Sequence, residues 1–412
     1  MDGNRVWLLF LAASALCGCA QHDPLPFAQI APAWNPEQEA SEARSSAYGA
    51  YIRAADSLDR ALGSKRDVLL RTNYSPHQRA ELKGQARDAL LCLREGSALP
   101  CTVPYAPPDT EASNKYRAEW RLLGRVLCWQ IEDECANDKL DDAVQHEILI
   151  TKLGFDLTGG SPTDATLGLV MVDSGRRAIL RSIEHFDAAR LRAMAEGVKK
   201  IYLDRPRIDR CARTAARDML VQVQRVQDSY RDQDYRWIEQ TLGDQAKEPI
   251  AYLSDLHEQT DQKRVQFFEG FADEARRAGT ALQREADLPL RIRVAQEQPA
   301  PTGQRPWKRL ARAFFDIGKP VLDMNDATCA RTQLLILESE IRAGLKTRGQ
   351  TPPDLSGFTK TLTVDPYSGD TFVYRTDGRE FKLYSVGKNL VDDNGETDET
   401  FTTPDLMLEV GR

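Results

Sequence analysis

The stretch ATCARTQLLILESEIRAGLKTRG, residues 327–349, predicts a long helix. Its apolar side chains recur on adjacent turns, at Leu334, Leu335, Leu337, Ile341 and Leu345. Because spacings of three and four residues place side chains on one face of a helix, this face must be buried against other parts of the chain. The segments that precede and follow the helix therefore decide the fold class.

Downstream of this helix the apolar period changes to two, which is typical of strands. The segments TFVYR (371–375) and REFKLYSV (379–386) flank Asp377-Gly378, a strong hairpin signal because glycine tolerates positive φ. Four side chains should meet across this hairpin: Phe372, Tyr374, Phe381 and Leu383. A long helix laid on a short antiparallel sheet buries both apolar faces, so residues 307–412 are predicted to form a small α+β domain.

Upstream of this domain, residues 37–286 have a helical apolar period nearly throughout. Turn signals interrupt it at places such as LTGGSPTD, residues 157–164. Each helix is polar outside one stripe and must pack against its neighbours, which predicts an irregular helical bundle. Prolines mark residues 287–306 as a linker between the two domains. The predicted fold class is mainly α, a bundle followed by the small α+β domain.

The N-terminus has the features of an export signal. Residues 6–16, VWLLFLAASAL, are an apolar run too short for a membrane span but suited to a signal peptide. This run ends in Leu16-Cys17-Gly18-Cys19, which resembles the bacterial lipobox. The resemblance implies a lipoprotein signal peptide over 1–18 and lipidation of Cys19. An ordinary secretory signal cut near by is the alternative.

The lipoprotein interpretation sets the location of the mature chain. Residues 19–36 contain several prolines and are predicted to form a stiff, extended tether. Multiple acyl chains would give a stable membrane anchor. Ala20 stands where an aspartate would resemble the inner-membrane retention signal, so the expected location is the cell envelope, at the outer membrane and facing the periplasm.

The cysteine number predicts disulfides, and the net charge limits the possible partners. Six cysteines remain after the signal: Cys92, Cys101, Cys128, Cys135, Cys211 and Cys329. In an oxidising compartment an even number predicts disulfides, with Cys92–Cys101 and Cys128–Cys135 as local pairs and Cys211–Cys329 as a long-range pair. The formal net charge of −7 argues against nucleic acid as a partner.

Two motifs near the C-terminus support a resemblance. VDPYSGDTFVYR (364–375) and FKLYSVGKNLVDDNGETDE (381–399), after the long helix, resemble the globular half of type II secretion major pseudopilins. They are also similar to uncharacterised bacterial proteins with the same DPYSG and LYSVG pattern. The similarity covers about residues 305–412. The pseudopilins polymerise through an apolar N-terminal helix that has no counterpart here, so we do not expect polymerisation.

The resemblance implies a calcium site in the loop after LYSVG. The candidate ligands are Asn389, Asp392, Asp393 and Asp398. Asn389 lies near a position that is often aspartate in the family, and Asp398 matches an aspartate of the family's TDAD-like ending. Asp392 and Asp393 have no clear counterpart, because the family's loop is richer in glycine. Calcium takes six to eight oxygen ligands, which such a loop could supply. A solvated acidic loop that binds nothing is the alternative.

No motif of the sequence announces a reaction. The five histidines are scattered without metal-site spacing, and Ser161 lacks a nucleophile-elbow context. A second acidic cluster, residues 131–142, favours a solvated, disulfide-closed loop. We therefore expect a non-enzymatic envelope lipoprotein, with a helical partner-binding domain and a calcium-stabilised pseudopilin-like module. A periplasm-facing hydrolase with an Asp/Glu site between the domains is the alternative.

Overall fold

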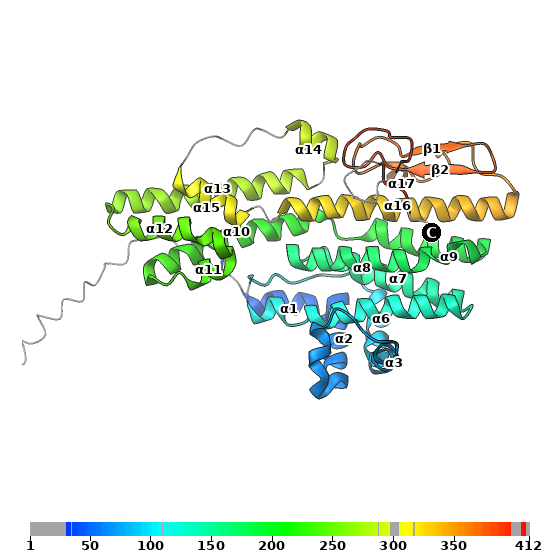
Figure 1. Ribbon diagram of the computed structural model, residues 1–412, viewed down its shortest axis with the longest axis horizontal. Coiled ribbons are helices and arrows are strands. Elements are labelled where there is room, and N and C mark those ends of the chain that lie inside the picture. The colour runs from blue at the N-terminus through cyan, green and yellow to red at the C-terminus, as the bar shows by residue number, and fades with distance from the viewer. Residues whose placement is uncertain are drawn as a thin grey trace, which may run out of the picture.

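The computed structural model describes residues 30–33, 35–108, 110–286, 288–296, 305–315, 318–396 and 405–408. Most of them are helical, and the strands form one two-stranded antiparallel sheet, so the mainly α prediction is confirmed (Figure 1). The first helices are α1 (Pro36–Arg44), α2 (Ala47–Leu62), α3 (Pro76–Gln85), α4 (Arg87–Ser97), α5 (Glu111–Asn114), α6 (Arg117–Ala136), α7 (Leu140–Leu157), α8 (Pro162–Leu180) and α9 (Ala188–Asp204). The remaining elements are α10 (Ile208–Asp232), α11 (Arg236–Leu242), α12 (Lys247–Leu256), α13 (Asp261–Glu285), α14 (Leu290–Gln296), α15 (Pro306–Phe315), α16 (Gly318–Arg348), α17 (Lys360–Thr363), β1 (Val373–Thr376) and β2 (Phe381–Tyr384).

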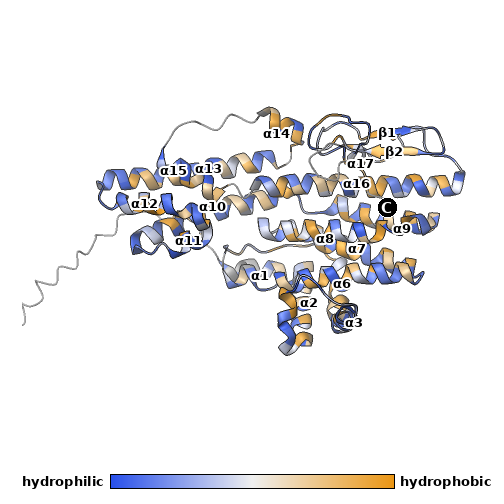
Figure 2. Cartoon of the chain, in the orientation of Figure 1, coloured by the Kyte–Doolittle hydropathy of each residue, from blue (hydrophilic) through white to orange (hydrophobic). Residues whose placement is uncertain are grey.

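Helix boundaries follow the local chemistry of the sequence. Ser161 begins α8 with a capping box, in which its hydroxyl accepts from the Asp164 amide and the Asp164 carboxylate accepts from the Ser161 amide. The predicted break at LTGGSPTD is therefore confirmed, because this cap satisfies amides that a helix start leaves unpaired. Figure 2 shows apolar and polar residues side by side along the helices, as expected of helices that bury one face.

Helix α16 lies between two layers. Its side chains contact α8 and α9, and it also contacts α17 and β2, which lie on its other side in Figure 1. The run Leu334–Leu337 is buried throughout, with at most 2% of any of its side chains exposed. The side-chain amide of Gln333 holds α17 and the residue after it against α16, by donating to the carbonyls of Thr361, Leu362 and Val364 at 2.8–3.2 Å. A long helix on a short antiparallel sheet is thus present as predicted.

The hairpin forms where it was predicted, but its register is shifted by two residues, so that the loop spans residues 377–380. Tyr374 pairs with Leu383 and Thr376 with Phe381, which places the four predicted side chains on one face. Gly378 in the turn has a φ of +93°, a conformation that L side chains rarely adopt.

The hydrophobic packing divides the chain differently from the predicted domain limits. One core joins α2, α4 and α6–α9 to most of α16 and the hairpin. The second core joins α10, α13 and α15 and is rich in aromatic rings, such as Phe271 stacked on Phe315 at 5.3 Å. Val321 and Leu322 at the start of α16 belong to this second core. Residues 37–286 and 307–412 therefore do not pack as separate units, because α16 runs through both cores.

Two further local predictions differ from the structure. The predicted linker, 287–306, contains α14, whose first amides at Leu290 and Arg291 donate to the carbonyls of Pro366 and Tyr367. Residues 131–142 are not one solvated loop, because most of them belong to the end of α6 and the start of α7. In both places, the chain forms helices where the local composition had predicted a linker or a loop.

Candidate functional site

The acidic loop after β2 is held by protein donors. Asp392 accepts from Arg375 at 2.8 Å, from the Tyr384 hydroxyl at 2.8 Å and from the Asn394 amide at 2.9 Å. The Asn394 amide and the Tyr384 hydroxyl lower the pKa of the Asp392 carboxyl. Asn389 donates to Asp393 at 2.8 Å. Part of the charge of this loop is therefore balanced by its own strand and turn.

Asp405 is a further carboxylate at this loop, and the sequence pattern did not indicate it. It is only 3% exposed, and one of its oxygens accepts from the Gly395 amide at 2.6 Å. Burial raises the pKa of its carboxyl, and the charges of Asp392 and Asp393 raise it further. No local pattern marks Asp405, because it comes into contact with the loop only through an antiparallel bridge between Ser385 and Leu406.

The calcium prediction stays a prediction. Among the described residues, no three His, Cys, Asp or Glu side chains lie close enough together to hold a metal ion. Asp398 lies outside the described residues, and calcium also takes backbone carbonyls and water as ligands.

The six cysteines are free thiols in the structure. Cys128 and Cys135 both lie in α6, seven residues apart, so their Cα atoms are separated by about 10.5 Å along one helix axis. A disulfide needs Cα atoms within about 7 Å, and this predicted local pair does not fit the helix. Cys211 and Cys329 belong to different cores. Cys19, the predicted lipidation site, lies outside the described residues.

The acidic side chains that the hydrolase alternative requires are dispersed. Several buried carboxylates each have their own donor: Glu119 with Arg66, Asp156 with Tyr51, Glu338 with Arg342, and Asp365 with Ser385. His146 is buried rather than on the surface, and its ring nitrogens lie 2.8 Å from Glu134 and from Arg94. These pairings stabilise the fold, and two of the arginines each hold a second carboxylate as well: Arg66 also pairs with Asp59, and Arg342 with Glu184.

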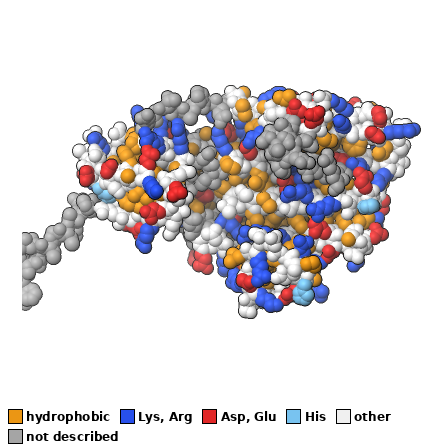
Figure 3. Space-filling model, viewed as in Figure 1, with side chains coloured by type: hydrophobic (Ala, Val, Ile, Leu, Met, Phe, Trp, Pro, Cys, Tyr) orange, Lys and Arg blue, Asp and Glu red, His pale blue; other side chains and the backbone are white. Residues whose placement is uncertain are grey.

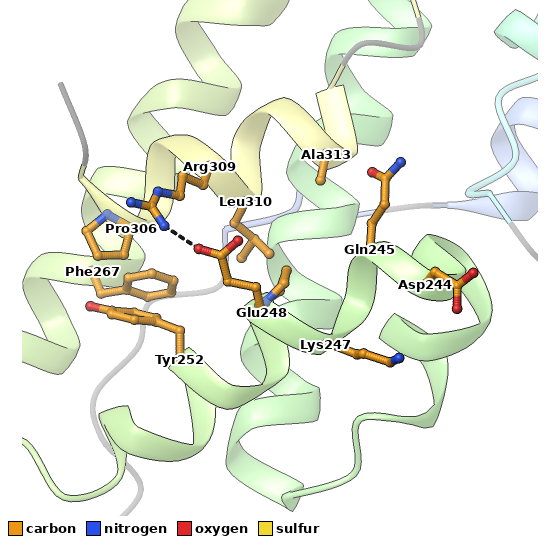
Figure 4. A pocket seen from close by; sticks show the side chains of 11 residues that line it. Asp244, Gln245, Lys247, Glu248, Tyr252, Phe267, Pro306, Arg309, Leu310 and Ala313 are labelled. Carbon is orange, nitrogen blue, oxygen red and sulfur yellow. Dashed lines mark hydrogen bonds and ion pairs between the residues drawn. The ribbon is translucent and has the colours of Figure 1, made fainter. Parts of the chain in front are cut away.

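Figure 4 shows a cavity of about 510 Å³ in the second core, between α12, α13 and α15. The rings of Tyr252 and Phe267, 5.3 Å apart, lie at one end of it, and the ion pair of Glu248 with Arg309 crosses it. Two cations and two carboxylates line this cavity. Its charge is therefore balanced and selects no ligand class.

A groove between α6 and α8 has a strong excess of positive charge. It encloses about 620 Å³ and is lined by five arginines and one glutamate: Arg79, Arg121, Arg125, Arg177, Arg181 and Glu132. We refer to it as the arginine groove. The chain as a whole has a net charge of −7, and the face shown in Figure 3 mixes both signs. The arginine groove is therefore a local reversal of the overall charge.

Helical spacing builds the walls of the arginine groove. On α6, Arg121, Arg125 and Glu132 recur at intervals of four and seven residues, and on α8 Val170 and Arg177 lie seven residues apart. The floor is apolar, because Gly124 and Met171 meet there. A Cβ at Gly124 would lie 3.0 Å from the Met171 side chain, so glycine permits this close helix approach.

The arginines at the rim are only partly neutralised. Arg181 pairs with Glu132 at 2.6 Å, whereas Arg125 donates to the carbonyl of Arg71 at 2.7 Å. Arg177 donates to the carbonyl of Asp173 at 3.3 Å. Arg121 is exposed and has no hydrogen bond or ion pair within the described chain. The arginine groove thus offers guanidinium groups whose charge is not cancelled by carboxylates.

An aromatic cluster adjoins this rim. The guanidinium of Arg79 lies 5.4 Å from the Trp129 ring, which packs edge-on against Tyr74 at 5.1 Å. Burial, followed by the charges of Glu147 and Glu132, raises the pKa of the Cys128 thiol to about 12, so this thiol stays protonated and is no nucleophile. The arrangement offers cations and apolar surface to an acidic, partly apolar ligand surface.

Comparisons with models of known protein families, with curated proteins and with solved structures found no match to this chain.

Proposed function

We propose that this protein is a non-enzymatic cell-envelope lipoprotein that binds an acidic protein partner in the arginine groove. The observation that carries the proposal is the combination of five arginines and one glutamate around an apolar floor, in a chain of net charge −7. Arginine forks bind carboxylates in a bidentate manner, and opposite charge steers association. The lipid anchor at Cys19 would hold this groove at the membrane surface.

The shape of the arginine groove favours a helical segment of the partner. The stripe from Arg121 to Glu132 follows α6 for about 16 Å, which is about three turns of a helix. An amphipathic helix can place apolar side chains on the floor, around Val170 and Met171, and acidic side chains against the rim. Val170 is 47% exposed, which leaves apolar surface for such a contact.

A designed peptide tests this proposal without knowledge of the partner. A labelled amphipathic helix of about four turns, with Leu on one face and Glu on the other, is titrated with the full chain and followed by fluorescence anisotropy. The same peptide with Lys in place of Glu serves as its control. We expect binding of the acidic peptide only, and weaker binding at higher salt.

Substitutions then locate the site. Arg121→Gln combined with Arg177→Gln should weaken binding of the acidic peptide about tenfold, or about 1.4 kcal/mol. The matched control is Arg53→Gln, because Arg53 is an exposed arginine on α2 that pairs with Glu95 at 3.5 Å outside the groove. Equal binding of both peptides, or equal effects of the groove and control variants, would refute the proposal.

The anchor and the module have separate tests. Cys19→Ser should abolish incorporation of a labelled fatty acid and release the protein from membranes, whereas an unmodified Cys19 in native material would exclude the lipoprotein interpretation. The C-terminal module is proposed to be stabilised by calcium at the loop of Asn389, Asp392, Asp393 and Asp398. The nearby buried Asp405 supports this proposal by supplying a further oxygen ligand.

A further inference from the structure

A second cationic cavity lies away from the arginine groove and shares none of its residues. It encloses about 720 Å³ between α7, α9, the start of α10 and the segment that follows α4. Its volume is within the range of small-molecule sites, which is about 300–1,000 Å³. The larger volume and the different elements distinguish it from the other cavities.

The charges around this cavity are unequal. Six cations line it: Lys152, Lys200, Arg205, Arg207, Arg210 and Arg213. Three carboxylates accompany them: Asp156, Asp204 and Asp209. In a chain that is acidic overall, such an excess at a concave site attracts anions.

Buried polar contacts fix one end of the cavity. Asp156 is 3% exposed, forms an ion pair with Lys152 and accepts from the Tyr51 hydroxyl at 2.5 Å. Burial raises the pKa of the Asp156 carboxyl, and the Lys152 ammonium opposes that shift. The ammonium of Lys152 is therefore held in place where it lines the cavity.

Two arginines are positioned by uncharged groups. The Arg205 guanidinium lies 3.8 Å from the Tyr202 ring centroid and donates to the Tyr202 carbonyl. Arg210 donates to the Val103 carbonyl at 3.4 Å. Neither contact cancels the positive charge, so both guanidinium groups can still bind an anion.

The rim adds further positive charge. Lys200 on α9 is exposed and has no ion pair within the described residues. Arg213, by contrast, pairs with Asp209 at 2.6 Å. The cavity also adjoins the first turn of α10, whose N-cap residue, Arg207, makes no side-chain capping bond. A helix start without such a cap adds a partial positive charge, which supports the cations but would not form a site alone.

We propose that this cavity binds a phosphate-bearing anion, such as a phosphate monoester or a pyrophosphate. Cations approach it from α7, α9 and α10, so a ligand with more than one negative charge and several acceptor oxygens fits better than a single carboxylate. The half-buried Cys101 lines the same cavity, and desolvation raises the pKa of its thiol well above the ordinary value, so it acts as a neutral wall. The proposal goes beyond the partner-binding function and does not depend on it.

Calorimetric titration of the full chain with inorganic pyrophosphate and with orthophosphate tests the proposal. We expect saturable binding of pyrophosphate that weakens as salt increases. Lys200→Gln together with Arg210→Gln should weaken it at least about tenfold, because each removes a charge-assisted contact. Lys200→Gln alone, at an exposed position, should weaken it severalfold and keeps the test valid if the double variant folds poorly.

Lys199→Gln is the matched control. Lys199 is adjacent to Lys200 on α9, pairs with Glu196 at 3.3 Å and does not line the cavity. Lys199→Gln should change the dissociation constant for pyrophosphate by less than about twofold, and so should Arg121→Gln in the arginine groove. These controls separate a refutation of the phosphate-binding proposal from a refutation of the partner-binding proposal.

Vesicles distinguish the two sources of phosphate. Binding to phosphatidic acid in phosphatidylcholine vesicles, lost in the Lys200 and Arg210 variants, would assign a lipid headgroup. Binding of pyrophosphate without such vesicle binding would assign a soluble ligand. No binding of either probe at millimolar concentration, or an equal loss in the Lys199 control, would overturn the proposal.

Discussion

Replacing Asp365 by asparagine tests why the DPYSG and LYSVG segments occur together in this chain. Asp365 is 1% exposed and contacts both segments. One carboxylate oxygen accepts from the Tyr367 amide at 2.9 Å. The other accepts from the Ser385 hydroxyl at 2.9 Å and from the Val386 amide at 3.2 Å. A single buried carboxylate thus fastens the turn before β1 to the end of β2.

The structure gives the size of the expected effect. Asparagine has one oxygen in place of two, so its NH₂ group must face either the Tyr367 amide or the donors at Ser385 and Val386. At least one buried donor then loses its acceptor, which costs about 1–3 kcal/mol. Asp365→Ala removes the acceptor of all three donors and should cost at least about 3 kcal/mol.

Urea unfolding followed by circular dichroism measures these free energies, and amide hydrogen exchange at Tyr367 and Val386 locates the change. The control is Asp370→Asn in the same turn, because Asp370 is exposed and pairs with the exposed Arg291 at 2.7 Å. That substitution should cost less than about 1 kcal/mol. If Asp365→Asn unfolds like the wild type, or costs no more than the Asp370 control, the fastening role of Asp365 is wrong.

Three further outcomes are expected. Burial raises the pKa of Glu147 to about 8 from its ordinary 4.5, so the folded state keeps this proton up to about pH 8 and stability falls from pH 4.5 to 8. Urea unfolding of Glu147→Gln should show a shallower fall than the wild type, and an unchanged slope would contradict the assignment. Alkylation of unreduced native protein with mass mapping should find Cys128 and Cys135 unpaired, and a peptide linking them would show that α6 is interrupted. Calcium should raise the melting temperature of the full chain and chelator lower it, with the effect lost in Asp393→Asn; identical melting in calcium and chelator would remove the metal from the proposal.

Patterns confined to a few turns or one hairpin were sufficient to predict local structure. The helix around Leu334 and the turn at Gly378 follow from spacing and φ preferences that act within about ten residues. The domain limits remain a prediction, because they depend on contacts between distant segments, which a local pattern does not show. Four consecutive apolar residues, Leu334–Leu337, cannot all lie on one face of a helix. Their complete burial follows only from the fold, in which α9 and β2 cover opposite faces of α16.

The candidate sites show the same limit. Arg121 and Arg125, spaced by four residues, have the pattern of a solvated helix face, and only the approach of α8 makes them the wall of a groove. The sequence signal that could have drawn attention to α8 is the pair Arg177 and Arg181, at the same spacing. The acidic loop could be recognised from the sequence because its carboxylates lie close together along the chain. Asp405 could not, because only folding brings it next to Gly395 in this loop.

The sharing of α16 between two cores also qualifies what the pseudopilin-like resemblance means for this chain. A fragment beginning at residue 305 would keep α15, α16 and the hairpin but lose α8, α9, α10 and α13. The α9-facing side of Leu334–Leu337 would then be exposed, as would Val321 and Leu322. Uncovering several apolar side chains costs about 1.5–3 kcal/mol each, comparable with the whole stability of a small domain. The proposed pseudopilin-like module would therefore rely on the helices that cover α16, and the calcium experiment needs the full chain.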